Sequence, residues 1–577
     1  MYRVATILIV RHKHPKQYRT NLGRGKIILK VYGNIMKTRT GTNLWLHLFL
    51  MLTLWVSNLY AQQVEPLAAS KAKPILQDTI HTLLSSFINK KTFNGIDSNF
   101  NAIGKVLERS EAPCFGRAYS IKWKKCSNPG LAGLECATFT VPKDYSDYSA
   151  GTFDLAVVRS RATGRSSERI GSLFVNLGGP GVPVMPFVSN FIDVLPAEIR
   201  KRFDVVLWEP RGVGQSSGLI DCKGGSFPLP TTGDVDWILI HEEMRKTQGA
   251  ANAECEERYP DIVPYIGTRS TVRDLEELRK AIGDQKLTYW GTSYGTRIGY
   301  VYAHDYPGQV RAMLLTSPIN PDARSWIEFA YPSAQAPDNA LGFFFDVFTG
   351  MREKYERCSA TLDVRELELP SGNVFTRWNL RATLGLMSVS ESNYRAIAEF
   401  INHVDAALHG DGEAVAVAIA ALDEATEPLF EGWINGGSIP FIGCPDYAIK
   451  PDAEEQLNLA MEARAKAPIS GWMATQGLYY CTGMTFTVDP VPVNFVNRNT
   501  PLLIMGSTYD SLTSYQWALD MTEMFRNSRL VTYEGATHTP FLAGSECVDR
   551  YGIDYLVRLI RPAKDVTCPN TLNKTVQ

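Results

Sequence analysis

Ser293 lies at the centre of the sequence Gly-Thr-Ser-Tyr-Gly, between a short β-type stretch and a helix-forming segment. A nucleophilic serine must stand clear of its own backbone, and a sharp strand-to-helix turn with glycines two residues to either side achieves this. The N-terminus of the following helix then presents N–H groups to an oxyanion. Because glycine and serine are common, an ordinary loop can carry the same pattern. Ser293 is therefore a candidate nucleophile for acyl transfer. The residues elsewhere in the chain must show whether this pattern is catalytic or an ordinary loop.

A serine hydroxyl needs an adjacent base, and that base needs an acid to orient it. In this topology the chain order is serine, then acid, then histidine. Of nine histidines, His538 is the one that follows a late core strand, so we predict it as the base. Asp510 follows the preceding strand and is predicted to orient it, although a carboxylate there could instead cap the next helix. Asp520 is the reserve, but we expect it inside a helix and pointing away.

The candidate oxyanion site is a glycine-rich turn. Residues 176–181 read Asn-Leu-Gly-Gly-Pro-Gly and follow a predicted strand. Glycines let backbone N–H groups approach a developing oxyanion, where fixed donors are worth several kcal/mol, on the order of 3. We assign the N–H groups of Gly179 and Tyr294 to this hole. Phosphate binding is disfavoured, because both G-x-G-x-x-G spacing and a P-loop lysine are absent. Residues 208–217 are predicted to form a rigid turn that buttresses the site.

These side chains must be positioned by a regular framework. Apolar runs that suit strands alternate with a helix-forming segment at residues 271–282, which we predict to begin at Thr271 and to end at Gly283. The rhythm predicts an α/β fold with a mostly parallel sheet and helices on both faces. The predicted strands are residues 153–158, 172–176, 204–208, 287–290, 310–315, 501–505 and 529–533, and a helix at 555–559 closes the chain.

The rhythm stops near Pro321 and returns at Pro501. The intervening residues are rich in helix formers and aromatics, which predicts a large, mainly helical cap inserted over the strand ends, where ligands of such sheets bind. We therefore divide the chain into an extension with a signal peptide (1–61), an N-terminal arm (62–110), a first core part (111–321), a cap (322–495) and a C-terminal core part (496–577).

The composition is that of a large globular protein. The chain has 577 residues, of which 45% are hydrophobic and 21% charged, and its net charge is −1. This length allows a large core and a second domain or insertion. The charge balance gives no indication of nucleic acid as a partner.

The first 64 residues carry no acidic side chain but many basic ones, and residues 44–56 form an apolar run. This run is short for a membrane span and suits a signal peptide that starts at Met36 and is cleaved after Ala61. We expect a secreted or periplasmic protein without stable membrane insertion after cleavage. The alternative is a retained N-terminal anchor.

The ten cysteines all lie beyond Ala61, form no C-x-x-C, and are even in number, which in an exported chain favours disulfides over metal binding. Sequence neighbours suggest four pairs, with Cys114 and Cys358 left over; several buried free thiols are the alternative. The four suggested pairs are Cys126–Cys136, Cys222–Cys255, Cys444–Cys481 and Cys547–Cys568.

The chain resembles the α/β-hydrolase-fold serine peptidases of the S33 type, in particular the tripeptidyl aminopeptidase-like branch, which is related to proline iminopeptidases. The resemblance covers roughly residues 110–570. It implies a hydrolase that needs no cofactor and releases short peptides or single residues from substrates with a free N-terminus. The matching motifs are residues 135–145, 178–181, 210–216, 291–295, 444–446 and 506–510, together with His538.

Two departures from that family concern substrate selection. Residues 315–321 lack both acids of the usual L-D-G-x-x-D-P, and Glu209 replaces the usual aspartate before Pro-Arg-Gly. An exopeptidase needs a carboxylate for the substrate amine, and Glu328, Asp405 and Asp446 are candidates. The same catalytic residues would equally serve an esterase or amidase acting on small acyl substrates, because the fold does not decide the substrate. The third alternative is a catalytically silent binding protein, which the loss of a catalytic residue would have favoured.

Overall fold

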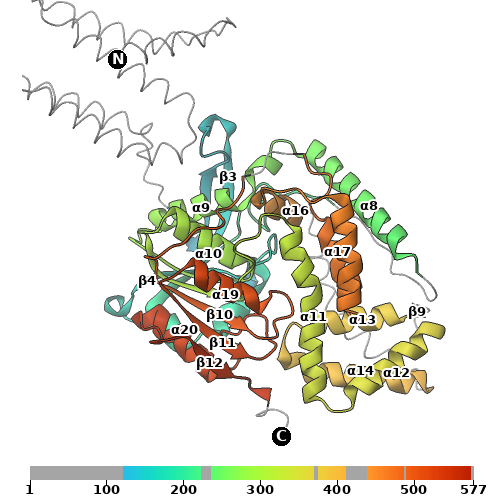
Figure 1. Cartoon of the computed structure of the whole chain (residues 1–577). Helices are drawn as coiled ribbons and strands as arrows, with labels where there is room; N and C mark the ends of the chain where they lie inside the picture. The colour runs from blue at the N-terminus through green and yellow to red at the C-terminus, as the bar shows by residue number, and fades with distance from the viewer. Residues whose placement is uncertain (1–120, 223–234, 369–373, 411–437, 486–488, 573–577) are drawn as a thin grey trace, which may run out of the picture. The chain divides into compact units, whose positions relative to one another are not determined.

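Ten strands form one sheet that is parallel over most of its width (Figure 1). The computed structural model describes residues 121–572 apart from 223–234, 369–373, 411–437 and 486–488. The strand order is β1-β2-β3-β5-β4-β6-β7-β10-β11-β12; pairing is antiparallel from β1 to β5 and parallel from β5 to β12. The strands are β1 Lys124–Lys125, β2 Glu135–Pro142, β3 Thr152–Ser160, β4 Gly171–Asn176, β5 Phe203–Trp208, β6 Leu287–Thr292, β7 Val310–Thr316, β10 Leu502–Ser507, β11 Ser528–Glu534 and β12 Val566–Pro569.

The central strands are apolar throughout because both faces of the sheet are covered. In β4, the side chains of Leu173 and Val175 belong to one hydrophobic cluster, whereas Phe174 belongs to the cluster on the opposite face. All three residues are at most 1% exposed. Successive side chains of a strand point to opposite faces, so a strand covered on both sides reads as a continuous apolar run.

Helices cover both faces. Side chains of α9, α10 and α19 join the cluster that contains Phe174, and side chains of α6, α7 and α20 join the cluster that contains Leu173. This two-layered cover is the arrangement that the alternating strand and helix pattern predicted. The helices are α6 Val188–Val194, α7 Ala197–Arg202, α9 Thr268–Ile282, α10 Tyr294–Asp305, α19 Tyr515–Met524 and α20 Glu546–Arg558.

A mainly helical region lies between β7 and β10 in the sequence, as predicted from the loss of strand rhythm. Figure 1 shows α11 and α17 side by side in this region. One further long helix is α8 Trp237–Arg258, which comes in sequence before the strand-to-helix turn at Ser293 (the elbow). It nevertheless packs against α17, a contact that the sequence did not reveal. The main elements are α11 Ile327–Val347, α12 Met351–Val364, β8 Leu367–Glu368, β9 Val374–Phe375, α13 Arg377–Met387, α14 Tyr394–Leu408, α16 Ile439–Gly443, α17 Ala453–Lys466 and α18 Gly471–Ala474.

Two element boundaries differ from the sequence predictions. Helix α9 begins at Thr268, three residues before the predicted cap Thr271, which is buried inside the helix. Its predicted end is confirmed, since Gly283 adopts the left-handed conformation. The helix predicted at residues 555–559 is the end of α20, which begins at Glu546. It is not the last element, because β12 follows it as an additional strand beside β11. A four-residue edge strand gives too little periodicity to be recognised from sequence.

Four disulfides join the predicted cysteine pairs: Cys126–Cys136, Cys222–Cys255, Cys444–Cys481 and Cys547–Cys568. Cys358, one of the two cysteines that the predicted pairs left unassigned, carries a free buried thiol and forms no disulfide with any of the described cysteines. Its thiol donates to Asp405 Oδ1 at 3.7 Å. Cys114 lies outside the described residues, as do the predicted signal peptide and N-terminal arm. No helix in the described ranges is both long and apolar enough to cross a membrane.

Candidate active site

Ser293 occupies a strained turn between β6 and α10. Its φ is 55° and its ψ is −123°, a conformation that residues with a side chain rarely adopt. The Tyr289 hydroxyl donates to the Gly295 carbonyl oxygen at 2.7 Å and so closes the turn. A Cβ on Gly295 would lie 2.5 Å from the Asn176 carbonyl oxygen, so this position requires glycine. The serine is thereby fixed at the carboxyl end of a central strand.

The glycine-rich turn after β4 lies directly against this elbow. Gly178 has a φ of 102°, and a Cβ there would lie 2.8 Å from the Thr292 carbonyl oxygen and 3.0 Å from Ser293 Cβ. The Gly178 N–H donates to Asn176 Oδ1 at 3.0 Å. The Gly179 N–H has no acceptor among the described residues. Tyr294 is the first residue of α10, where N–H groups lack an intrahelical acceptor. Both predicted oxyanion donors are thus backbone groups beside Ser293.

His538 and Asp510 are in direct contact. The His538 Nδ1 atom lies 2.9 Å and 3.0 Å from the two carboxylate oxygens of Asp510, which is 4% exposed. Asp510 Oδ1 also accepts the N–H groups of Leu512 and Thr513, each at 2.9 Å, in the turn before α19. The alternative that Asp510 caps this helix is wrong, because the N-cap residue of α19 is Ser514. Burial alone would raise the pKa of Asp510, but the His538 ring and these N–H groups outweigh it and lower that pKa. The carboxylate is therefore ionised at neutral pH.

The backbone at the serine and beside the histidine is hydrogen-bonded to two adjacent residues at the end of β7, Thr316 and Ser317. The Ser293 N–H donates to the Thr316 carbonyl oxygen at 3.0 Å, and the Thr539 N–H donates to Ser317 Oγ at 2.9 Å. Ser317 is buried and has a φ of 50°. Within the described residues no direct hydrogen bond joins Ser293 Oγ to the His538 ring. In unliganded enzymes such contacts are often long and tighten when substrate binds.

The helical region holds the histidine loop from the other side. The His538 N–H donates to the Val389 carbonyl oxygen at 2.9 Å. Two residues on, the buried Glu391 carboxylate accepts the Ala536 N–H at 3.1 Å and also the Tyr533 hydroxyl. Sequence reasoning missed these contacts, because Glu391 is one of many acidic residues in helical segments and carries no recognisable motif.

A chain of buried polar side chains links the elbow to Asp446, in the motif at residues 444–446. The Tyr294 hydroxyl lies 2.6 Å from Thr268 Oγ1, which donates to Asp446 Oδ2 at 2.7 Å. Arg297 Nη1 also donates to Asp446 Oδ2, at 3.3 Å. Burial raises the pKa of Asp446 to about 6, with Arg297 and Thr268 opposing the rise. These hydrogen bonds connect Tyr294, whose N–H is a predicted oxyanion donor, with Asp446 in the helical region.

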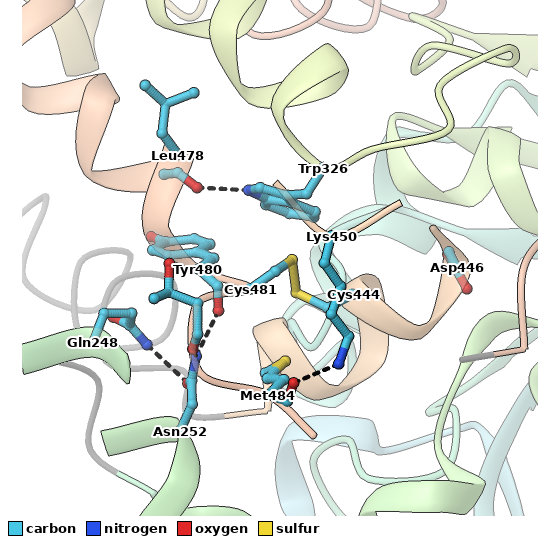
Figure 2. The surroundings of a disulfide bond; sticks show 12 residues. Gln248, Asn252, Trp326, Cys444, Asp446, Lys450, Leu478, Tyr480, Cys481 and Met484 are labelled. Atoms are coloured by element: carbon cyan, nitrogen blue, oxygen red, sulfur yellow. Dashed lines mark hydrogen bonds between the residues drawn. A yellow bond between two sulfur atoms is a disulfide. The ribbon is translucent and has the colours of Figure 1, made fainter. Parts of the chain in front are cut away.

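The Cys444–Cys481 disulfide fixes the segment that carries Asp446 (Figure 2). Lys450 Nζ donates to the Met484 carbonyl oxygen at 2.7 Å and forms a second link between the same two segments. The disulfide, Lys450, Met484 and Trp326 line a small pocket on this side of the helical region. Asp446 therefore lies in a segment that the disulfide and Lys450 hold in place.

Glu209 has a structural role, because its carboxylate binds backbone N–H groups of two separate segments. Its buried carboxylate accepts the N–H groups of Val184 and Met185, each at 3.0 Å, and the N–H of Gln215 at 2.5 Å. Burial raises the pKa of Glu209, and these three donors oppose the rise. The side chain thus ties the turn after β5 to the segment that follows the oxyanion turn, as the predicted rigid turn would require.

The three candidate carboxylates for a substrate amine differ in their surroundings. Asp446 is 1% exposed and paired with Arg297. Asp405 lies near Lys354 and Cys358 in the far part of the helical region. Glu328 is exposed and accepts the Arg324 N–H through Oε2, and its own carbonyl oxygen accepts from Asn320 Nδ2 in the loop after β7. Glu328 is therefore the candidate beside the carboxyl ends of the strands.

The arrangement has the parts that acyl transfer requires: a half-buried serine on an elbow, an imidazole oriented by an ionised carboxylate, and fixed backbone donors. In the described part of the chain no three His, Cys, Asp or Glu side chains are grouped so as to hold a metal ion.

Residues 172–545 match the family described as the alpha/beta hydrolase fold, so the chain belongs to that family. It is a serine hydrolase. It is similar to serine protease Hip1 of Mycobacterium tuberculosis, with 26% identity over 497 residues, 78% of this chain and 91% of that protein. It is also 26% identical over 468 residues to tripeptidyl aminopeptidase of Streptomyces lividans, covering 78% and 86% of the two chains. Carboxylesterase B of M. tuberculosis is 25% identical over 489 residues, covering 77% and 89%.

Proposed function

We propose that this hydrolase is an exported aminopeptidase that releases short peptides or single residues from peptide N-termini. Ser293 attacks the scissile carbonyl carbon while His538 takes its proton, and Asp510 holds the imidazole tautomer and stabilises the charged ring. The Gly179 and Tyr294 N–H groups bind the tetrahedral oxyanion. His538 then donates its proton to the leaving amine, and water hydrolyses the acyl-enzyme.

The observation that carries this assignment is the His538–Asp510 hydrogen bond at 2.9 Å beside an elbow whose serine is packed against a glycine turn. The similarity to a tripeptidyl aminopeptidase and to a serine protease favours peptides as substrates. We further propose that the helical region, residues 322–495, is a cap over the serine and selects the substrate.

Glu328 is our candidate for the carboxylate that binds the substrate's free amine. It is exposed, lies in the segment that follows β7, and uses Oε2 to accept a backbone N–H, which leaves Oε1 for another donor. Asp446 is unsuited because it is 1% exposed and its charge is already paired with that of Arg297. Export is supported by the four disulfides, which are typical of oxidising compartments.

The test is hydrolysis of aminoacyl-, prolyl- and tripeptidyl-arylamides, each with a free or a blocked N-terminus, by the protein and its Ser293→Ala variant. We expect serine-dependent cleavage of the free-amine substrates and loss of cleavage on blocking. Glu328→Gln should raise KM for free-amine substrates at least tenfold and leave blocked ones unaffected, with Glu399→Gln, an exposed change on α14, as the matched control. Equal cleavage of blocked and free peptides would refute the exopeptidase assignment.

The second candidate is a carboxylesterase, which the similarity to carboxylesterase B favours. A short acyl ester in the same panel separates the two activities. Turnover of the ester with none of the arylamides would establish the esterase. If no substrate is cleaved, the alternative of a catalytically silent binding protein on this fold stands, and the helical region is examined next.

A further inference from the structure

Three tryptophans, a histidine and a tyrosine form a connected aromatic group in the helical region. The Trp237 ring centroid lies 5.1 Å from that of Trp378, which lies 5.1 Å from that of Trp472. His241 lies 6.2 Å from Trp237 and 5.9 Å from Tyr479. The residues come from α8, α13, α18 and η8 (Thr475–Tyr479), and α17 packs against α8 and α18 (Figure 1).

Guanidinium groups surround these rings. Arg464 of α17 lies 3.3 Å from the centroid of Trp237, and Arg377 and Arg381 lie 4.4 Å and 5.1 Å from that of Trp378. Burial raises the pKa of Tyr479 and the charge of a fourth guanidinium, that of Arg245 on α8, opposes the rise, which places Arg245 near the phenol. We call these four arginines and five aromatic side chains the Arg–Trp cluster.

The positive charge of the Arg–Trp cluster is poorly compensated. Arg377 forms an ion pair with Asp363. Arg381 donates to the neutral Ser359 hydroxyl at 3.4 Å. Arg245 and Arg464 make no ion pair with any of the described residues. Asp338 lies near the cluster, since burial and, less strongly, the charge of Asp338 raise the pKa of Tyr355, which is hydrogen-bonded to Arg381. Its carboxylate accepts the N–H groups of Ile469 and Ser470 and, within the described residues, forms no ion pair with Arg381.

The buried polar atoms of the same cluster lack acceptors. Trp378 Nε1, Trp472 Nε1, Arg381 Nε and Arg464 Nε are buried donors without a hydrogen-bond partner among the described residues. The Tyr479 hydroxyl and both ring nitrogens of His241 are also buried and lack such a partner. Indole and guanidinium N–H groups can only donate. Trp378, His241 and Tyr479 are each at most 2% exposed, so water does not reach these atoms freely. Buried polar groups are almost always paired, so this concentration of orphaned donors requires an explanation.

Two groups in the cluster have lowered pKa values, as expected where positive charges lie together without a negative one. Burial, and next the charges of Arg381 and Arg377, lower the pKa of Arg464 to about 10. Burial, and next the charge of Arg464, lower the pKa of His241 to about 4, so this ring is neutral at pH 7. Packing alone accounts for arginines stacked on indoles. It accounts neither for the uncompensated charge nor for the donors that lack an acceptor.

We propose that the Arg–Trp cluster binds a small oxyanion, a carboxylate or phosphate group, at a site separate from Ser293. Planar guanidiniums bind both groups in bidentate fashion, and the indole and phenol donors would satisfy the remaining oxygen lone pairs. Arg377, Arg464 and Trp237 are partly exposed, so the cluster reaches the surface along this side. A peptide carboxylate and free inorganic phosphate share this chemistry, and the experiment separates them.

The test is isothermal titration of the Ser293→Ala protein with inorganic phosphate and with acetate, at constant ionic strength set with sodium chloride. Quenching of tryptophan fluorescence is recorded in parallel, since three indoles line the cluster. We expect saturable binding of at least one anion. Arg464→Gln should weaken it tenfold or more, whereas Arg165→Gln, a change of equal charge at a side chain that is 84% exposed, should leave it unchanged.

Preference for phosphate identifies the free anion as the ligand, and preference for acetate identifies a carboxylate. If Arg464→Gln fails to fold, Arg245→Gln replaces it, because that side chain is partly exposed on α8. Absence of saturable binding overturns the proposal, as does equal binding by the protein and the cluster variant. Since the readout is binding, the result does not depend on which substrate Ser293 cleaves.

Discussion

The backbone N–H of His538 donates to the carbonyl oxygen of Val389 at 2.9 Å, although 149 residues separate them. Val389 belongs to the helical region, and His538 belongs to the loop after β11. The position of the imidazole therefore depends on how the helical region packs on the sheet. A change in that region can alter the reaction without touching Ser293, Asp510 or His538.

Asp510→Asn should lower kcat about 10⁴-fold with little change in KM, because an amide stabilises the wrong tautomer of the ring and cannot stabilise its charged form. The fold should persist, since the amide oxygen can still accept the N–H groups of Leu512 and Thr513. Steady-state kinetics and thermal unfolding measure the two effects. Asp520→Asn on α19 is the control and should keep full activity. A variant of Asp510 that retains more than a tenth of kcat would exclude this residue as the orienting acid.

Glu391→Ala should lower kcat more than it changes KM, because the carboxylate fixes the loop that carries His538. Loss of its hydrogen bonds with Ala536 and Tyr533 should also reduce the free energy of unfolding by about 2 kcal/mol. Glu399→Ala, at an exposed site on α14, should change it by about 0.5 kcal/mol or less. Chemical denaturation and kinetics on the same preparations make the comparison. An unchanged kcat despite lower stability would show that Glu391 is purely structural.

Gly178→Ala should lower kcat by roughly 10²-fold, because small displacements of reacting groups have effects of that size. The new Cβ would lie 2.8 Å from the Thr292 carbonyl oxygen and 3.0 Å from Ser293 Cβ, so the oxyanion turn or the elbow must shift. Gly308→Ala is the matched control, since nothing lies within 4 Å of the Cβ that it adds. Comparable kinetics for the two variants would mean that the turn tolerates displacement and is not the oxyanion site.

Asp446→Asn should change the pH dependence of stability. Burial raises the pKa of Asp446 to about 6 in the folded protein, above the unfolded value of about 3.9. The folded state therefore binds this proton more tightly, so the group's stabilising contribution is complete below about pH 4 and is lost as the pH rises through 6. Urea unfolding at pH 4, 5, 6 and 7 should show this decline, of about 3 kcal/mol at most, in the native protein and not in the variant. Parallel curves would show that Arg297 keeps Asp446 ionised throughout.

The sequence determined the framework and the candidate catalytic residues, because both depend on local signals. Strands buried on two faces read as continuous apolar runs, and the elbow is defined by glycines that its own turn requires. The seven predicted strands, which correspond to β3, β4, β5, β6, β7, β10 and β11, and the four disulfides are confirmed. The chain order of serine, acid and histidine then selected Ser293, Asp510 and His538, and the structure places Asp510 against His538.

Only the tertiary structure decided which distant residues support that site. Glu391, Thr268 and the segment at Ser317 act through contacts with residues far away in sequence, and no periodicity or motif marks such contacts. The same holds for α8, which precedes the elbow yet packs in the helical region, and for Arg245, which α8 brings near Tyr479. Local sequence encodes which elements form, whereas the packing of elements determines which side chains share a buried environment, and hence their charge state and their partners.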